Sequence, residues 1–171
     1  GKEIKTSHER DLNKVNWSDV DIVLECTGKF KDSASCNLHL QNGAKKVIIS
    51  APTNDESIKT IIYGVNENII TKNDDILSIG SCTTNCLAPI TKILHDQLTI
   101  TKGFVTTIHA YTNDQNLTDG SHKDMRRARA AAVSMIPTST GAAKAISKVI
   151  PDLAGKLDGT AIRVPTSNVS M

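Results

Sequence analysis

A strand, a helix and a second strand near the N-terminus narrow the possible folds more than any other feature. Residues 20–27 (VDIVLECT) form an apolar run typical of a strand buried on both faces of a parallel sheet. Asp32 or Ser33 can cap the helix that follows. That helix runs to about Gln41, and a second apolar strand lies at 45–50. Because such a βαβ unit connects parallel strands, the sequence predicts an α/β fold with a mostly parallel sheet.

The pattern of elements changes after Gly80. Before it, two more strands are predicted at 60–65 and 74–80. After it, we predict helices at 82–98 and 141–150 and strands at 103–112 and 160–166. We therefore place a domain boundary here, with residues 1–80 as an α/β part and residues 81–171 as an α+β part.

Two segments of the second part are distinctive. In the helix at 82–98 the apolar side chains share one face, and they are Cys86, Ile90, Ile93, Leu94 and Leu98. The segment 113–139 is polar and basic, and we expect it to be mostly irregular. Loops of this length in compact domains are usually functional or make contacts.

Composition limits the class of protein. Hydrophobic residues make up 39% and charged residues 22%, as in soluble globular proteins, and no apolar run is long enough to cross a bilayer. The N-terminal residues are polar and lack the apolar core of a signal peptide, so we expect a cytoplasmic protein. In that setting the four cysteines are expected to be thiols and not a disulfide framework. A net charge of +2 gives no general attraction to nucleic acids or membranes.

The stretch SIGSCTTNCLAPI at 78–90 carries two cysteines. Zinc sites usually have closer cysteine pairs and a second ligand pair, and a disulfide within one helical turn is disfavoured, so we expect no metal here. A thiol at a helix N-terminus is a better nucleophile, because free N–H groups stabilise its thiolate. Cys82 has that position, and His109, at the end of a predicted strand, is the candidate base. The residues alone leave open that neither of the two has a catalytic role.

Hydroxyl and guanidinium groups form a second set of candidates. Two predicted helix starts are rich in hydroxyl groups and suit an anion, at Ser81, Thr83 and Thr84 and at residues 138–141 (TSTG). Forked guanidinium donors are present at Arg126, Arg127, Arg129 and Arg163. The cluster at 126–129 also suits a solvated, inter-subunit or nucleic-acid surface, although few aromatic residues accompany it, which argues against single-stranded nucleic acid.

Together these motifs resemble those of the phosphorylating glyceraldehyde-3-phosphate dehydrogenases. The resemblance spans nearly the whole chain and rests on SCTTNCLAP (81–89), TTIHAYTNDQ (106–115), RRARAAA (126–132), IPTSTGAAKA (136–145) and GKLDGTAIRVPTSNVS (155–170). Weaker matches are VDIVLECTGKF (20–30) and KKVIISAP (45–52). The most specific feature is SCTTNC with a histidine 27 residues after its first cysteine.

The resemblance implies an enzyme that oxidises D-glyceraldehyde 3-phosphate to 1,3-bisphosphoglycerate with NAD(P) and inorganic phosphate. Cys82 would be the nucleophile that forms a thiohemiacetal and then a thioester, and His109 would be its base. The family's substrate and phosphate ligands correspond to Ser81, Thr83, Thr112, Asp114, Arg127, Thr140, Gly141 and Arg163. Its cofactor-lining positions correspond to Thr27, Gly28, Phe30, Ser50 and Ala51. The resemblance also implies a cytoplasmic homotetramer of glycolysis or gluconeogenesis, with segment 113–139 at a subunit interface.

Departures from the family pattern refine these expectations. Ile79-Gly80 replaces the usual Asn-Ala before the active-site Ser-Cys. Gly120-Ser121 stands where many NAD-specific members have Leu-Pro and NADP-accepting photosynthetic relatives have small residues, so NADP is the alternative to NAD. The chain also lacks the Gly-rich phosphate loop with which the family begins.

The chain is therefore expected to be a central piece of a longer enzyme. Residues 1–80 would be the C-terminal half of a Rossmann-like NAD(P)-binding domain, and residues 81–171 the N-terminal half of an α+β catalytic domain. The chain begins at Gly1 and ends in a strand-like run without a cap, which agrees with this interpretation. On its own the segment is expected to lack a strong cofactor site and to be inactive.

Other functions remain to be separated from this one. Erythrose-4-phosphate dehydrogenase is a close relative, although TSTGAAKA and AYTNDQ are more similar to the glyceraldehyde-phosphate branch. A truncated chain that serves only in assembly would lack an activated thiol. Nucleic-acid binding through residues 123–129 would be salt-sensitive, and we do not expect it to be the main role.

Overall fold

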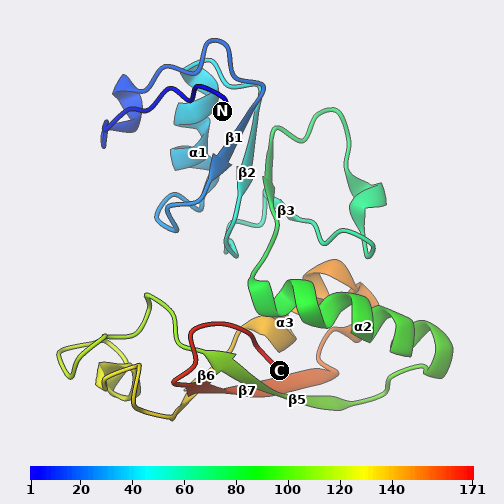
Figure 1. Cartoon of the computed structure of the whole chain (residues 1–171). Helices are drawn as coiled ribbons and strands as arrows, with labels where there is room; N and C mark the ends of the chain where they lie inside the picture. The colour runs from blue at the N-terminus through cyan, green and yellow to red at the C-terminus, as the bar shows by residue number, and fades with distance from the viewer. The chain divides into compact units, whose positions relative to one another are not determined.

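The computed structural model describes residues 1–171 and divides into two compact units, Gly1–Ser81 and Cys82–Met171 (Figure 1). Each unit has its own sheet, with four strands in the first and three in the second. No helix combines the length and the apolar character that a membrane span requires.

The first unit is built on a parallel sheet, as the βαβ pattern predicts. Its strands are β1 (Ile22–Glu25), β2 (Lys46–Ile49), β3 (Lys59–Thr60) and β4 (Ile76–Ser78), in the spatial order β1-β2-β4-β3. Every neighbouring pair is parallel, which confirms the predicted α/β class. The helices are α1 (Ser33–Gln41) and the short 3-10 helices η1 (Leu12–Lys14) and η2 (Glu67–Ile69). The Asp32 carboxylate accepts a hydrogen bond of 2.8 Å from Ser35 N and so caps α1 as predicted.

The core of this unit lies between α1 and one face of the sheet. Its buried members are Val23, Cys36, Ala44, Val47, Ile49 and Ile58. The other face of β1 is open, since Ile22 and Leu24 are 51% and 65% exposed. The prediction that this strand is buried on both faces is therefore wrong for this chain, because α1 covers one face and nothing in the unit covers the other.

β3 is shorter than the strand predicted at 60–65. The side chain of Asn66 folds back onto the segment, donating to Thr60 O at 2.9 Å and accepting from Ile62 N at 2.8 Å. These two bonds close a turn at residues 63–66, so Ile61 and Ile62 are buried without continuing the strand, whereas Tyr63 is 87% exposed.

A buried polar chain links β1 and α1. Glu25 and His39 are each 3% exposed, and His39 Nε2 lies 3.1 Å from Glu25 Oε2. Trp17 Nε1–H donates to His39 Nδ1 at 3.0 Å, so the neutral ring donates from Nε2 to the carboxylate. The other carboxylate oxygen accepts from Thr27 N at 2.7 Å and from the Thr27 hydroxyl. Both oxygens of this buried carboxylate are therefore hydrogen-bonded, which is what allows its burial.

Replacing His39 with alanine is expected to lower the free energy of unfolding by about 3 kcal/mol, because it removes a donor from the buried Glu25 carboxylate and leaves a cavity. Urea denaturation of the complete protein would measure this. His39→Gln keeps a side-chain N–H and should recover part of the loss, whereas His8→Ala, at an exposed histidine, should be neutral. A loss below about 1 kcal/mol for His39→Ala would show that the pair does not hold the fold together.

The second unit is a three-stranded sheet with two helices over one face (Figure 1). Its strands are β5 (Gly103–Ala110), β6 (Ile136–Ser139) and β7 (Leu157–Val164), in the order β5-β7-β6. β5 is parallel to β7, and β6 is antiparallel to it. The helices are α2 (Cys82–Leu98), α3 (Ala142–Val149) and the 3-10 helices η3 (Met125–Ala128) and η4 (Pro151–Leu153). The bounds of α2 are those predicted, so Cys82 is the first residue of a helix.

α2 packs with a different face from the one that its apolar residues suggest. Its buried side chains are Thr84, Ala88 and Thr91. The large apolar side chains of the predicted face lie on the surface, namely Ile90, Ile93, Leu94 and Leu98. Small side chains let α2 approach its neighbour α3 closely, so the packing in this unit uses the small-residue face.

The segment 113–139 is more ordered than predicted. It contains η3, and its last four residues form the edge strand β6, in which Pro137 is tolerated because an edge strand need not donate on both sides. Backbone hydrogen bonds of 3.0–3.2 Å cross the segment and join Asn116 N to Arg127 O, Gly120 N to Ala128 O and Ala131 N to Asn116 O. The two limbs of the loop are therefore tied together.

Candidate active site

Cys82 and His109 lie side by side in the second unit. Cys82 begins α2 and is exposed, whereas His109 lies near the end of β5 and is buried. Cys82 Sγ is 3.3 Å from His109 Nε2, within hydrogen-bonding distance. The fold thus brings together the two residues that the sequence analysis paired as nucleophile and base.

The backbone fixes which nitrogen of His109 faces the thiol as an acceptor. His109 Nδ1 lies 2.6 Å from the Ala110 carbonyl oxygen. Because a carbonyl oxygen only accepts, Nδ1 carries the proton, and Nε2 of the neutral ring presents its lone pair to Cys82 Sγ. Transfer of the thiol proton to Nε2 gives a thiolate–imidazolium pair, and the partial positive charge at the start of α2 stabilises the thiolate. The arrangement is suited to generate a sulfur nucleophile.

Alkylation by iodoacetamide at pH 7 is expected to be at least about tenfold faster at Cys82 than at Cys86, because only Cys82 has a proton acceptor and a helix start beside it. Cys86 is a matched control, since it lies one turn further along α2 and is also exposed. Cys36 should react last, because burial raises the pKa of its thiol to about 11. Mass spectrometry of time-resolved samples would rank the sites, and equal rates at Cys82 and Cys86 would contradict thiol activation.

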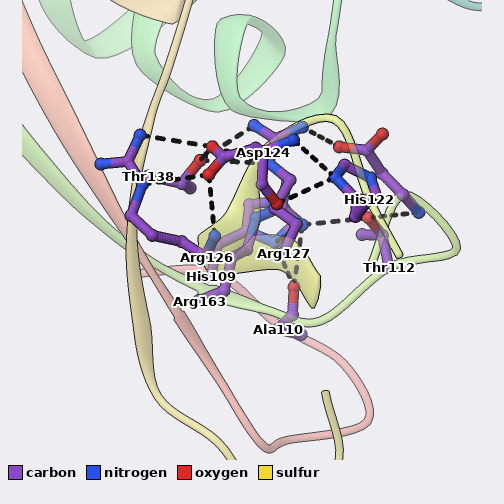
Figure 2. Close-up of polar contacts among 10 residues, drawn as sticks. His109, Ala110, Thr112, His122, Asp124, Arg126, Arg127, Thr138 and Arg163 are labelled. Carbon is purple, nitrogen blue, oxygen red and sulfur yellow. Dashed lines mark hydrogen bonds and ion pairs between the residues drawn. The ribbon is translucent and has the colours of Figure 1, made fainter. Parts of the chain in front are cut away.

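Arg163 lies beside His109 because the two residues are register partners in the parallel pair β5 and β7. Arg163 Nη1 donates to Ala110 O at 3.1 Å and to Thr112 Oγ1 at 3.2 Å. It is also 3.2 Å from His109 Nδ1, but its two hydrogens are directed to the two oxygens. Figure 2 shows this cluster of His109, Ala110, Thr112 and Arg163.

Arg127 adds a second guanidinium group to the site. Arg127 Nε and Nη2 donate to Thr138 Oγ1 at 3.1 and 3.0 Å, and Nη1 donates to the Asp114 carboxylate. Asp114 N donates in turn to Thr112 Oγ1 at 3.4 Å. A polar cavity of about 590 Å³ adjoins this group, lined by Asp114, Ser121, His122, Lys123, Asp124, Arg127 and Ser139.

The charges in this cluster favour an anionic ligand. Burial lowers the pKa of Arg163, and the positive charge of Arg127 lowers it further, while Asp114 and Cys82 act in the opposite direction. Two guanidinium groups that repel one another are stabilised by an anion that contacts both, and a phosphate group can accept from each. Four of the predicted substrate residues therefore form one connected cationic site, namely Thr112, Asp114, Arg127 and Arg163.

Comparison with known protein families identifies the family to which these residues belong. Residues 81–171, which include Cys82, His109, Arg127 and Arg163, match the family model described as glyceraldehyde 3-phosphate dehydrogenase, C-terminal domain. The chain belongs to this family. The resemblance inferred from the motifs is thereby confirmed.

Curated relatives within the glyceraldehyde 3-phosphate dehydrogenase family are similar along the entire chain. Identity is 58% to glyceraldehyde-3-phosphate dehydrogenase 1 of Bacillus subtilis, 57% to glyceraldehyde-3-phosphate dehydrogenase of Clostridium acetobutylicum and 55% to that of Geobacillus stearothermophilus. Each alignment covers 100% of this chain and 52% of the relative. The chain therefore spans about half the length of the curated relatives that it matches.

The remaining phosphate residues suggested by the glyceraldehyde 3-phosphate dehydrogenase family lie around helix starts. Thr83 Oγ1 is 4.0 Å from Cys82 Sγ, and Ser81 precedes that cysteine as the last residue of the first unit. Thr140 and Gly141 lie at the start of α3, where Thr140 Oγ1 accepts from Ala142 N at 3.2 Å. No hydrogen bond of the structure joins Thr140 or Gly141 to Arg127.

The residues that the glyceraldehyde 3-phosphate dehydrogenase family suggests for the cofactor lie together in the first unit. Thr27, Gly28 and Phe30 follow β1, and Ser50 and Ala51 follow β2. Because β1 and β2 are parallel neighbours, these residues occupy one edge of the sheet, the edge at which open α/β sheets bind their ligands. Gly28 has φ of +71°, which glycine adopts without strain and which allows the tight turn after β1.

Two residues of the site have contacts that were not predicted from the sequence: Asp124, and Thr138, which the sequence analysis placed only in the hydroxyl-rich stretch 138–141. Asp124 precedes η3, accepts from Arg126 N at 3.0 Å and pairs with the Arg126 guanidinium at 3.1 Å. Thr138 points inward from β6 to Arg127. The signals were present: an Asp before a helical turn is a capping pattern, and residues 136–139 alternate between apolar or inward and exposed positions.

Proposed function

We propose that the complete enzyme of which these residues form a part oxidises D-glyceraldehyde 3-phosphate to 1,3-bisphosphoglycerate with NAD(P) and inorganic phosphate. The observation that carries the proposal is the 3.3 Å contact between Cys82 Sγ and His109 Nε2 at the start of α2, next to two phosphate-compatible arginines. Membership in the glyceraldehyde 3-phosphate dehydrogenase family supports the choice of substrate.

In the proposed mechanism, His109 and Cys82 act as a base and a nucleophile. His109 Nε2 takes the thiol proton, and Cys82 Sγ adds to the aldehyde carbon to form a thiohemiacetal. The Cys82 N–H and the His109 ring stabilise the oxyanion of this adduct. When bound, the nicotinamide supplies the hydride acceptor. His109 Nε2 first returns its proton to this oxyanion, which gives the thiohemiacetal hydroxyl and a neutral imidazole. As hydride leaves the former aldehyde carbon, His109 Nε2 takes the hydroxyl proton again, and the acyl group left on Cys82 is a thioester. Phosphate then attacks that carbonyl carbon, and Cys82 leaves as a thiolate.

Two groups of residues divide the phosphate binding in this proposal. Thr112 and Arg163 hold the phosphate group of the substrate, with Asp114 orienting the site. Ser81, Thr83, Arg127, Thr140 and Gly141 hold the phosphate that attacks the thioester. The hydrogen bond of 3.2 Å between Arg163 Nη1 and Thr112 Oγ1, and the anchoring of Arg127, support this division.

The cofactor is proposed to bind at the carboxyl ends of β1 and β2 through Thr27, Gly28, Phe30, Ser50 and Ala51. This edge suits a dinucleotide, because it is exposed around Gly28 and because Glu25 fixes the Thr27 turn. NAD is the proposed cofactor, and Gly120-Ser121 in place of Leu-Pro makes NADP the alternative to test. We further propose a cytoplasmic homotetramer.

Steady-state assays of the complete enzyme would test the proposal. With glyceraldehyde 3-phosphate, phosphate and either NAD or NADP, reduced cofactor should form in proportion to acyl phosphate. A higher kcat/KM for erythrose 4-phosphate would replace the proposed substrate, and turnover that does not require phosphate would contradict the phosphorylating step. Absence of turnover with both aldehydes would leave an assembly role as the function.

A further inference from the structure

The guanidinium group of Arg127 is anchored along one edge by a single hydroxyl group. Arg127 Nε and Nη2 both donate to Thr138 Oγ1, at 3.1 and 3.0 Å (Figure 2). Arg127 Nη1 donates to the Asp114 carboxylate. Of the five N–H groups of an arginine, these bonds use one on Nε, one on Nη2 and one on Nη1. One N–H therefore remains on each terminal nitrogen, and both can donate to the oxygens of an anion.

Thr138 is placed for this purpose by the sheet. It lies on β6, opposite Ala161 of β7, and its side chain is 2% exposed. Because Oγ1 already accepts from two donors, its own hydrogen points elsewhere, and Asp124 Oδ2 at 3.5 Å is the acceptor. Asp124 is itself fixed by Arg126, through Nε at 3.1 Å and the backbone N at 3.0 Å. A chain of contacts thus runs from Arg126 through Asp124 and Thr138 to Arg127.

We propose that Thr138, oriented by Asp124, is a positioning residue that presents Arg127 to the attacking phosphate. The proposal rests on the proposed function in assigning Arg127 to that phosphate. Thr138 does not touch the anion; it holds the guanidinium plane so that the two remaining N–H groups face the ligand. Without the hydroxyl, Arg127 keeps only the contact with the exposed Asp114 carboxylate and a longer one of 3.9 Å to Asp124.

The negative charge of Asp124 also fixes the orientation of the Thr138 hydroxyl group. Arg126 lowers the pKa of the Asp124 carboxyl, chiefly by hydrogen bonds to its side chain and backbone N–H, so the group is an anion at neutral pH and acts as an acceptor. An anionic acceptor fixes the direction of the Thr138 O–H and leaves the hydroxyl lone pairs for Arg127. Asp124→Asn is therefore expected to weaken the anchoring less than removal of the hydroxyl does.

The test compares two substitutions of one residue in the complete enzyme. Thr138→Val keeps the shape and removes the hydroxyl, and Thr138→Ser keeps the hydroxyl. We expect Thr138→Val to raise the KM for phosphate about tenfold, while the phosphate-free burst of reduced cofactor and the KM for the aldehyde change less than about twofold. Thr138→Ser should return the KM for phosphate to within about threefold of the unmodified enzyme.

A matched control separates positioning from general loss of structure. Thr107 is a second buried threonine of the same sheet, and its hydroxyl bonds Ser170 Oγ at 2.9 Å and not an arginine. Thr107→Val should leave the KM for phosphate unchanged. The proposal would be overturned if Thr138→Val lowered the burst and raised both KM values together, or if it left the KM for phosphate unchanged.

Calorimetric titration with inorganic phosphate gives a readout that does not depend on turnover. If the unmodified protein binds phosphate but shows no catalysis, the proposed function fails. The positioning role would still be supported if Thr138→Val bound phosphate about tenfold more weakly, which is the loss expected for one hydrogen bond to a charged group. If the unmodified protein does not bind phosphate, or if Thr138→Val binds it equally well, the positioning role is excluded. Should Thr138→Val fail to fold, Asp124→Asn with a smaller loss of affinity in the same direction serves as the deciding variant.

Discussion

Replacing Cys82 with serine in the complete enzyme is expected to lower the rate of aldehyde oxidation by a factor on the order of 10⁴ or more. An alcohol holds its proton far more tightly than a thiol, so His109 Nε2, which lies 3.3 Å from the present sulfur, could not maintain an anion there. The thioester, which stores the oxidation for phosphate attack, would also become a poorly reactive ester. The initial rate of cofactor reduction with saturating aldehyde and phosphate measures this loss.

Cys86→Ser is the control for that experiment, because Cys86 is an exposed thiol of the same helix without a histidine partner. It should retain turnover within about twofold. If Cys82→Ser kept about a tenth of the activity, the sulfur would not be the nucleophile, and the proposed chemistry would have to be abandoned.

A His109→Asn variant is expected to lower kcat by about 10²–10⁴, with a much smaller change in the KM for the aldehyde. Asparagine has a similar reach and can donate to Ala110 O in place of Nδ1, but its amide cannot take a proton from the thiol at neutral pH. The same substitution should slow alkylation of Cys82 toward the rate of Cys86, since the thiolate loses its partner.

His95→Asn is the matched control, because His95 lies in the same unit and its Nδ1 accepts from Ile100 N at 3.1 Å, a bond that an amide oxygen can replace. A His109→Asn enzyme with reduced kcat and unchanged alkylation at Cys82 would assign His109 to the later proton transfer alone. If neither quantity changed, the 3.3 Å contact would have no catalytic meaning.

Local sequence patterns were sufficient to predict most helices and strands. They failed for features that depend on how the elements pack against one another. The cap at Asp32 and the bounds of α2 follow from residues that act within one turn of a helix. The buried face of α2 does not, because it depends on how closely α3 approaches. β7 begins at Leu157, three residues before the predicted start, and so includes Gly159. Glycine is required at this position of the strand, because a Cβ there would lie 2.7 Å from Val105 O of the neighbouring strand.

The residues of the candidate site can also be divided into those that local patterns predict and those that depend on tertiary packing. Cys82 and His109 could be paired from helix-start chemistry, from a strand end and from a specific motif. Thr138 could not, because its role depends on the register of β6 against β7, and that strand lies in a segment that reads as polar loop. The capping pattern at Asp124 could be recognised in the sequence, but its contact with Thr138 could not, because the strand β6 brings Thr138 to it from 14 residues away.

The backbone hydrogen bonds that tie Asn116 to Arg127 and Ala131 also bear on the thermodynamics of anion binding. A loop that orders only when its ligand arrives loses conformational entropy at that moment, about 0.5–1.5 kcal/mol for each side chain immobilised. Here the loss has already occurred during folding. Association with phosphate should therefore be limited by removal of water from the ion and from the Arg127 guanidinium group. A mutation that loosens the loop would appear as a larger entropic penalty even where every contact to the anion is retained.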